Sequence, residues 1–317
     1  MAIVFAKAPG KIILFGEHAV VYGQPAIAIP VNKVSATARV IPNPEALTGG
    51  VRVQAPDIML DSDLANLAED HPIAIAARLS IKAAAVKQVP GIILQISSTI
   101  PMSAGMGSSA AISIAIIRAL SDFFGAPLSA DQVSSIAYEV EKFQHGTPSG
   151  IDNNVIAHQK PVYFIRDKPI EHLDIEQPTY WVIADSGEKT PTRETVSEVR
   201  KLYDSDPESY QECFNQIGEI TRNAREILIK GSIAKLGQLM DENQRLLEQI
   251  NISSPSLDNL ITAAKIAGAL GAKLSGGGRG GNIIALATPD NLEQIGSALI
   301  NAGAKRVITT ILNRWRT

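Results

Sequence analysis

Several features that define other protein classes are scarce in this chain of 317 residues. It has one cysteine, Cys213, so it can form neither an intrachain disulfide nor a cysteine metal cluster. Its formal net charge is −3, which leaves no overall basic field for a nucleic-acid backbone or an anionic membrane. Any polyanion must therefore be bound locally, which favours a small phosphate ligand.

Signals for targeting and membrane insertion are also missing. The first residues, MAIVFAKAPGK, lack a basic segment followed by an apolar segment and a small-residue cleavage site. No run reaches the roughly 18 apolar residues of a membrane span. We therefore expect a cytoplasmic protein, monomeric or homodimeric, that binds neither membrane nor nucleic acid.

The pattern of strands and helices indicates a mixed fold in two domains. Short β-branched segments bounded by glycine or proline dominate the first hundred residues, with one helix near 71–88. Helical periodicity follows at 108–125 and 129–146, and residues 193–250 are rich in helix formers. The C-terminal part alternates helices and strands as a split βαβ sandwich does. The sequence thus predicts an α+β protein with domains at 1–178 and 179–317.

The segment PMSAGMGSSAA, residues 101–111, joins a strand to a helix through glycines. Free N–H groups in a first helical turn, together with the positive end of the helix dipole, form an anion site. Gly105 and Gly107 would let the backbone approach phosphate oxygens closely. The alternative is that Ser108 or Ser109 merely caps the helix.

Two glycine patterns imitate a dinucleotide fingerprint. Residues 105–110 match GxGxxA, but no acidic residue ends a following strand about 20 residues later. Residues 276–281 match GxGxxG, but the strand-like NIIALA follows instead of a helix. The Walker A sequence GxxxxGK[ST] and the zinc motif HExxH are absent, so these common sites are not expected.

Three segments together resemble the GHMP kinase superfamily: APGKIILFGEHAVVYG at 8–23, PMSAGMGSSAA at 101–111 and KLSGGGRGG at 273–281. Within it, GEHAVVYG and HGTPSGIDN, at 145–153, look like the mevalonate kinase family. The resemblance implies a two-lobed fold with a ribosomal protein S5 domain 2-like N-terminal lobe and a ferredoxin-like C-terminal lobe. It also implies an active site in the cleft between the lobes and transfer of phosphate from ATP to the primary hydroxyl of mevalonate.

The resemblance assigns catalytic roles to Asp152 and Lys11. Asp152 is similar to the family's carboxylate that accepts the alcohol proton, and Lys11 to the lysine beside it, which would stabilise charge on the transferring phosphoryl group. Without the motifs, Asp152 would be interpreted as a turn cap and Lys11 as a charge at a strand edge. The implied phosphate-binding residues are Ser103, Ala104, Gly105, Gly107, Ser108 and Ser109.

The implied cofactor is Mg²⁺, bound by Ser109 and Glu141 together with phosphate oxygens. Glu139 is close in sequence but falls on a different helix face, and Ser108 is the alternative hydroxyl. The implied acceptor-binding residues are Glu17, His18, Thr192 and Gly277.

Alternatives remain for this acceptor set. His18 could be a structural donor, Thr192 could be a helix N-cap, and Thr190 and Thr195 are nearby substitutes for Thr192. Arg279 interrupts the third glycine motif, where it could reach a phosphate, reach the acceptor carboxylate or point to solvent.

Two other functions compete with mevalonate phosphorylation. A GHMP kinase could act on phosphomevalonate, homoserine, a sugar or the 3-hydroxyl of mevalonate, or the chain could be a non-catalytic binder with the kinase fold. A related decarboxylase is expected to lack the lysine partner. The joint presence of Lys11, Ser109, Glu141 and Asp152 favours the kinase that acts on the primary alcohol, because a pure binder needs no such set.

Overall fold

The computed structural model describes residues 2–46, 49–101, 105–145, 148–188, 192–231 and 233–313. The chain forms two compact units. Unit 1 comprises Met1–Lys11, Pro30–Pro101 and Gly107–Gln159, and unit 2 comprises Ile12–Ile29, Met102–Met106 and Lys160–Thr317. Strands β1 (Val4–Phe15) and β2 (Ala26–Pro42) each pass from one unit into the other, so no single cut divides the units. The domain boundary near residue 179 stays a prediction.

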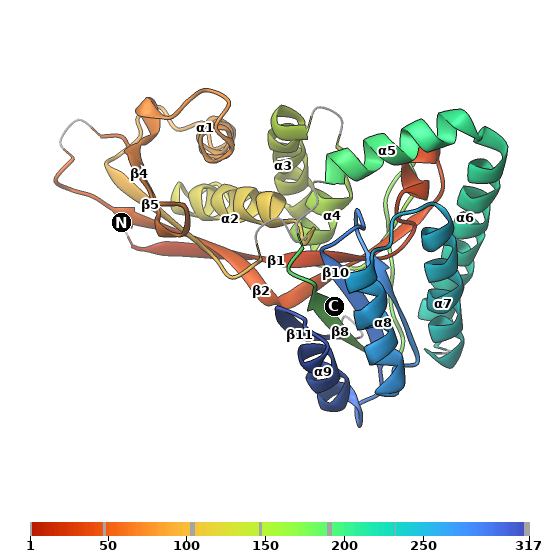
Figure 1. Cartoon of the computed structure of the whole chain (residues 1–317). Helices are drawn as coiled ribbons and strands as arrows, with labels where there is room; N and C mark the ends of the chain where they lie inside the picture. The colour runs from red at the N-terminus through yellow and green to blue at the C-terminus, as the bar shows by residue number, and fades with distance from the viewer. Residues whose placement is uncertain are drawn as a thin grey trace. The chain divides into compact units, whose positions relative to one another are not determined.

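Unit 1 packs helices on strands. Its remaining elements are β3 (Val51–Ala55), η2 (Pro56–Ile58), β4 (Leu60–Asp63), η3 (Leu64–Asn66), α1 (Pro72–Ala83), β5 (Ile92–Ser98), α2 (Ser108–Phe123), α3 (Ala130–His145) and α4 (Ile151–His158) (Figure 1). The C-terminal part of β2 pairs antiparallel with β5, from Ala36↔Ser98 to Pro42↔Ile92. Strand β3 is parallel to β5 and antiparallel to β4.

Alternation along β2 explains why the four helices lie on one face of these strands (Figure 1). Val34, Ala36, Ala38 and Val40 are buried, and the residues between them point to the more exposed face. Helix α2 lies in the middle of this layer, and most of its residues are buried. Its many alanines and serines permit close packing on every side, so the start of α2 is held rigidly.

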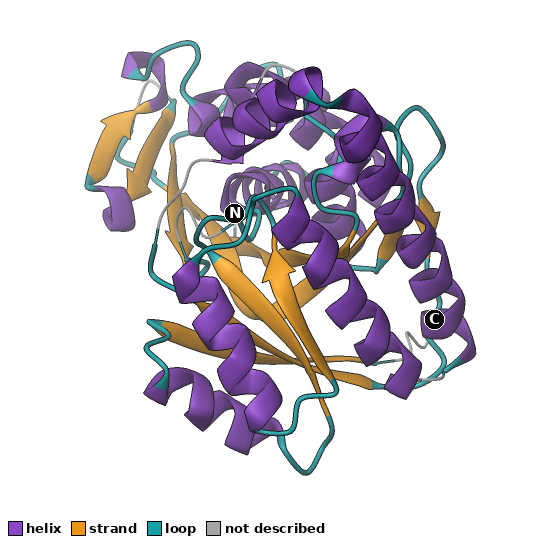
Figure 2. Cartoon of the chain, turned by 45° about the vertical axis from the view of Figure 1, so that its right-hand side comes forward, coloured by secondary structure: helices purple, strands orange, loops and turns teal. Residues whose placement is uncertain are grey.

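Unit 2 contains a four-stranded antiparallel sheet in the order β11-β8-β10-β9. The strands are β8 (Thr179–Asp185), β9 (Gly271–Ser275), β10 (Asn282–Ala287) and β11 (Arg306–Leu312). Helix α8 (Pro255–Ile266) precedes β9, and α9 (Leu292–Asn301) connects β10 to β11. Counted along the chain, this is a βαββαβ unit with strand order 4-1-3-2, with both helices on one face of the sheet (Figure 2). The predicted α+β class and the ferredoxin-like C-terminal topology are confirmed.

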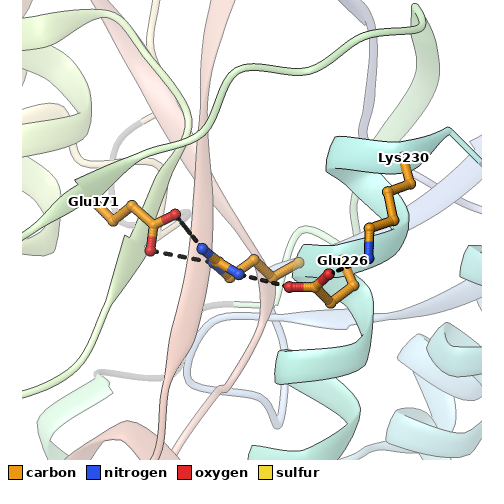
Figure 3. Close-up of polar contacts among 4 residues, drawn as sticks. Glu171, Glu226 and Lys230 are labelled. Atoms are coloured by element: carbon orange, nitrogen blue, oxygen red, sulfur yellow. Dashed lines mark hydrogen bonds and ion pairs between the residues drawn. The ribbon is translucent and has the colours of Figure 1, made fainter.

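Three helices are inserted between β8 and α8: α5 (Thr192–Ser205), α6 (Pro207–Lys230) and α7 (Ile233–Gln249). Unit 2 also contains η1 (Ala19–Tyr22), β6 (Val162–Phe164) and β7 (Glu171–His172). The Arg225 guanidinium fixes α6 to β7, because it donates to Glu171 at 2.5 Å while also pairing with Glu226 of its own helix (Figure 3). Lys230 extends this network by pairing with Glu226 at 2.7 Å.

Two details differ from the sequence-based predictions. Residues 151–158 form helix α4, which the sequence analysis did not predict. Residues 26–31 and 35–42, which the sequence suggested as two short strands, are parts of one strand, β2, because its backbone continues through Pro30. Proline lacks an N–H donor, which is why it falsely suggested a strand end.

Candidate active site

Lys11 and Asp152 meet inside unit 1. Lys11 lies on β1 and Asp152 in the first turn of α4, with 3.1 Å between Lys11 Nζ and Asp152 Oδ1. The lysine side chain is 7% exposed and the aspartate side chain 32%. The N-cap of helix α4 is Gly150, which has φ 84°, and the Ser149 hydroxyl accepts from the Ile151 N–H at 3.3 Å. Asp152 is therefore not the turn cap considered above, and Lys11 is not an edge charge.

Neighbouring residues fix the orientation of the Asp152 backbone. Asn153 Nδ2 donates to both the hydroxyl and the backbone carbonyl of Ser134 on α3, at 2.8 and 3.1 Å. Asn153 is buried, so these bonds hold the first turn of α4 against α3. The sequence analysis missed this role; the signal was an asparagine directly after the aspartate in GIDN.

Gly107 brings the glycine loop to the Lys11–Asp152 pair. It has φ 68° and is the N-cap of α2. A Cβ placed on it would lie 3.0 Å from Lys11 Cγ, 3.4 Å from Asp152 Oδ2 and 2.9 Å from Ile156 Cδ1. Glycine is required here by its left-handed backbone and by this close approach. The helix N-terminus and the charged pair are thus neighbours within one unit.

The other glycine-loop predictions have mixed outcomes. Gly105 has φ 69° and open space where a Cβ would stand, so its backbone is accessible. Ser108 and Ser109 are the first two residues of α2, and no side chain bonds to its cap position. The alternative in which one of them caps the helix is wrong, because Gly107 is the cap. Ser103 and Ala104 lie outside the described residues.

Ser109 on α2 and Glu141 on α3 form an oxygen pair in unit 1. Ser109 Oγ donates to Glu141 Oε1 at 2.8 Å, and Glu141 is only 6% exposed. Glu139, in contrast, is exposed and pairs with Lys142 at 2.8 Å. Among the described residues, no group of three or more His, Cys, Asp or Glu could hold a metal ion. One hydroxyl and one carboxylate suit Mg²⁺, which keeps waters and takes phosphate oxygens as ligands.

His18 and Gly277 meet inside unit 2. His18 Nε2 lies 2.9 Å from the Gly277 carbonyl oxygen, and since a carbonyl only accepts, Nε2 carries the proton. His18 has φ 57° and is 6% exposed. Burial lowers its pKa from 6.5 to about 4; the Gly277 hydrogen bond acts in the opposite direction and the Arg279 charge in the same one. The ring is therefore neutral at pH 7, with Nδ1 as an acceptor.

Glu17, predicted to contact the acceptor, forms a fully buried ion pair with Lys273 on β9. Lys273 Nζ also donates to the Leu274 carbonyl at 2.7 Å. Burial lowers the pKa of Lys273, and the Glu17 charge opposes this shift. Ser275 Oγ adds a 2.7 Å bond to the Ile13 carbonyl. The first and third motifs are therefore joined inside unit 2, partly through a lysine that the sequence analysis did not single out.

The remaining acceptor predictions fall at α5. Thr192 is the first residue of α5, but its side chain lies outside the described residues. Thr195, the alternative, is 1% exposed. Arg279 is not directed only to solvent, because its guanidinium pairs with Glu198 of α5 and donates to the Asn251 carbonyl.

Comparison with known proteins identifies the family. Residues 71–159 match the model of the GHMP kinases N-terminal domain, and residues 224–305 match that of the GHMP kinases C-terminal domain. A mevalonate kinase of Thermococcus sibiricus is 35% identical, over 97% of this chain and 96% of its own length. This chain belongs to the mevalonate kinase family of GHMP kinases. A further family member, from Saccharolobus solfataricus, is 32% identical over 90% of both chains.

Solved structures of the mevalonate kinase family have the same fold. The mevalonate kinase of L. major, solved in complex with R-mevalonate, superposes with a TM-score of 0.83 at 29% identity, covering 99% of this chain and 96% of that one. The Methanococcus jannaschii mevalonate kinase gives a TM-score of 0.84 at 26% identity, covering 99% of both chains. No described helix of this family member is long and apolar enough to cross a membrane.

Proposed function

We propose that this chain transfers the γ-phosphate of ATP to the primary hydroxyl of mevalonate, giving 5-phosphomevalonate and ADP. The observation that carries the proposal is the Lys11–Asp152 pair, which lies against Gly107 at the start of α2. The proposal is supported by relatives that are named mevalonate kinases and that share about a third of their residues with this chain over nearly its whole length. One similar structure is of a mevalonate kinase in complex with R-mevalonate.

Asp152 is the proposed proton acceptor. Its carboxylate is about one-third exposed, while its lysine partner is buried, so one carboxylate face remains open to an alcohol. Phosphoryl transfer needs mainly positioning and charge stabilisation. A carboxylate that orients the hydroxyl and takes its proton supplies the positioning. Lys11 supplies the charge stabilisation, as a fixed positive charge near the transferring group.

The start of α2 is the proposed phosphate site. The first-turn N–H groups and the helix dipole favour an anion, and Gly105 and Gly107 keep side chains away from it. Ser109 and Glu141 would hold Mg²⁺, which supplies charge neutralisation on the ATP phosphates when bound. The close contact of Gly107 with Asp152 brings the phosphate site and the proton acceptor together.

His18 is the proposed ligand for an acceptor hydroxyl. Because its Nε2–H is donated to Gly277, its Nδ1 is left as an acceptor for a hydroxyl proton. Glu17 would support this ligand through Lys273 instead of contacting the acceptor itself.

A coupled ADP-release assay with Mg·ATP tests the function, using mevalonate, phosphomevalonate, homoserine and galactose as acceptors. We expect selective turnover of mevalonate, with a product phosphorylated at the primary hydroxyl. Selective turnover of another acceptor would refute mevalonate as the substrate but would still support phosphoryl transfer from ATP. No turnover with any acceptor would favour the non-catalytic binder.

Two substitutions test the assigned roles. Asp152→Asn should lower kcat by roughly 10²–10⁴-fold while leaving ATP binding nearly intact, and a normal kcat would refute the role of Asp152. Glu141→Gln should raise the Mg²⁺ concentration needed for half-maximal rate. Glu139→Gln is its matched control on the same helix, because Glu139 is exposed and paired with Lys142. Equal metal dependence in both variants would contradict the metal assignment.

A further inference from the structure

Arg279 occupies an unusual position inside the third glycine motif, Gly276–Gly281. Its φ is 56°, and Gly276, Gly278, Gly280 and Gly281 also have positive φ. A glycine would adopt this left-handed backbone without strain, whereas a side chain is disfavoured there. Contacts made by the arginine side chain must therefore offset the strain of its backbone.

Backbone hydrogen bonds fix the C-terminal half of the loop. Arg279 N–H donates to the Ile252 carbonyl at 2.7 Å, and Gly281 N–H donates to the Glu188 carbonyl at 3.0 Å. A Cβ at Gly278 would collide with the Ile252 carbonyl oxygen, so the loop lies directly on this segment. The Arg279 side chain thus begins from a rigid point of unit 2.

The guanidinium links this loop to two helices. Its Nε donates to the Asn251 carbonyl at 3.1 Å, just after the end of α7, where a positive charge is favoured by the helix dipole. Its terminal nitrogen pairs with Glu198 on α5. The arginine side chain is 28% exposed and the glutamate 48%, so the ion pair is partly shielded from water.

Helix α5 has a second anchor in the first motif. The Arg200 guanidinium lies 5.9 Å from the centre of the Tyr22 ring and 5.6 Å from that of Tyr203, and the two rings are 4.8 Å apart. Tyr22 ends the same short segment that begins with His18. Helix α5 is therefore tied at two positions: Arg200 ties it to the His18 segment, and Glu198, on a different face, ties it to the loop that carries Gly277.

We propose that Arg279 is a positioning residue for the acceptor: by joining the third glycine motif to α5 and to the end of α7, it fixes the loop whose Gly277 carbonyl holds His18. The proposal rests on the proposed function. Neither an ATP phosphate nor the acceptor carboxylate is assigned to Arg279, because Glu198 and Asn251 already receive its guanidinium.

Steady-state kinetics with mevalonate and ATP provide the first test. Arg279→Gly and Glu198→Gln should each raise the KM for mevalonate about two- to fivefold, the range expected for a partly exposed ion pair, with the KM for ATP unchanged. The double variant should be no worse than Arg279→Gly alone, and Arg279→Lys should restore part of the loss because the charge remains. Lys230→Gln is the control, since it breaks the exposed Lys230–Glu226 pair on α6, which involves neither anchor of α5.

Hydrogen exchange of the protein without ligands provides a test that needs no turnover. Amides of α5 should exchange about two- to fivefold faster in Arg279→Gly and in Glu198→Gln, while those of α9 do not change. An unchanged mevalonate KM, or an equal rise in both KM values, would overturn the proposal, as would unchanged α5 exchange. If the wild-type chain does not turn over mevalonate, the proposed function is refuted. The exchange rates of the α5 amides then test by themselves whether Arg279 holds α5 in place.

Discussion

The buried Glu17–Lys273 pair makes a sharp prediction about stability. Both side chains are 0% exposed, and the lysine lies 5.9 Å from the centre of the Phe15 ring. Lys273→Met keeps a similar length and volume but leaves the Glu17 carboxylate buried without its countercharge. Breaking one partner of a buried pair costs about 3–5 kcal/mol, whereas replacing both partners by neutral groups costs far less. We therefore expect Lys273→Met to lose about 4 kcal/mol of unfolding free energy.

The assay is urea denaturation followed by circular dichroism at low temperature, with Glu17→Gln/Lys273→Met as the second variant. The double variant should recover most of the lost stability, to within about 2 kcal/mol of the wild type. A loss below about 1 kcal/mol in Lys273→Met would refute the reasoning, because the pair would then carry little energy.

The same two variants separate a structural role of Glu17 from direct contact with the acceptor. If Glu17 only holds the turn through Lys273, the double variant should regain a near-normal KM for mevalonate together with its stability. If Glu17 contacts the acceptor, stability should recover and the KM should stay high. We expect the first result, because the Glu17 residue is only 1% exposed.

Three other substitutions test separate features. Gly107→Ala should lower kcat at least about tenfold, because its Cβ would press on Ile156 and Lys11, and Gly125→Ala, with a similar φ but open space, is the control for backbone strain. The stability gained from neutral His18 is complete above pH 6.5 and is lost as the pH falls toward its folded pKa of about 4. His18→Asn should therefore remove about 2 kcal/mol of the stability difference between pH 7 and pH 5, measured by urea denaturation at both pH values. Arg225→Met should cost about 1 kcal/mol without changing kinetics, because its pairs are partly exposed, and a changed KM would contradict this structural role.

The glycine-rich motifs predicted the local backbone well, because their glycines mark left-handed conformations that few other residues allow. Gly107 has the left-handed φ that such a loop requires, and β10 follows the third motif directly, as the rejection of a dinucleotide site assumed. Sequence spacing also separated Glu141 from Glu139, since residues two apart point to different faces of a helix. The structure places one beside Ser109 and the other at the surface.

Partners distant in sequence could not be predicted in this way. Lys273 pairs with a residue 256 positions away, and no local pattern records such a contact. A lysine inside the otherwise uncharged strand β9 was the available signal, because a charge at a buried strand position needs an opposite charge. Arg279 likewise had three open interpretations until Glu198 and Asn251 were located beside it.

The beginnings of α2 and α4 share a property that suits the proposed chemistry. Each follows a left-handed glycine, so neither N-cap residue has a side chain to bond the first turn, although Ser149 Oγ accepts from the Ile151 N–H of α4 at 3.3 Å. Helices α6 and α8 of unit 2 begin instead with Asp206 and Ser254, whose side chains accept from first-turn N–H groups. A side-chain cap from the N-cap residue stabilises a helix by about 1 kcal/mol, and α2 and α4 lack this stabilisation. The first-turn N–H groups of α2 would then be available to the proposed phosphate ligand, and the dipole of α4 favours the Asp152 carboxylate in its first turn.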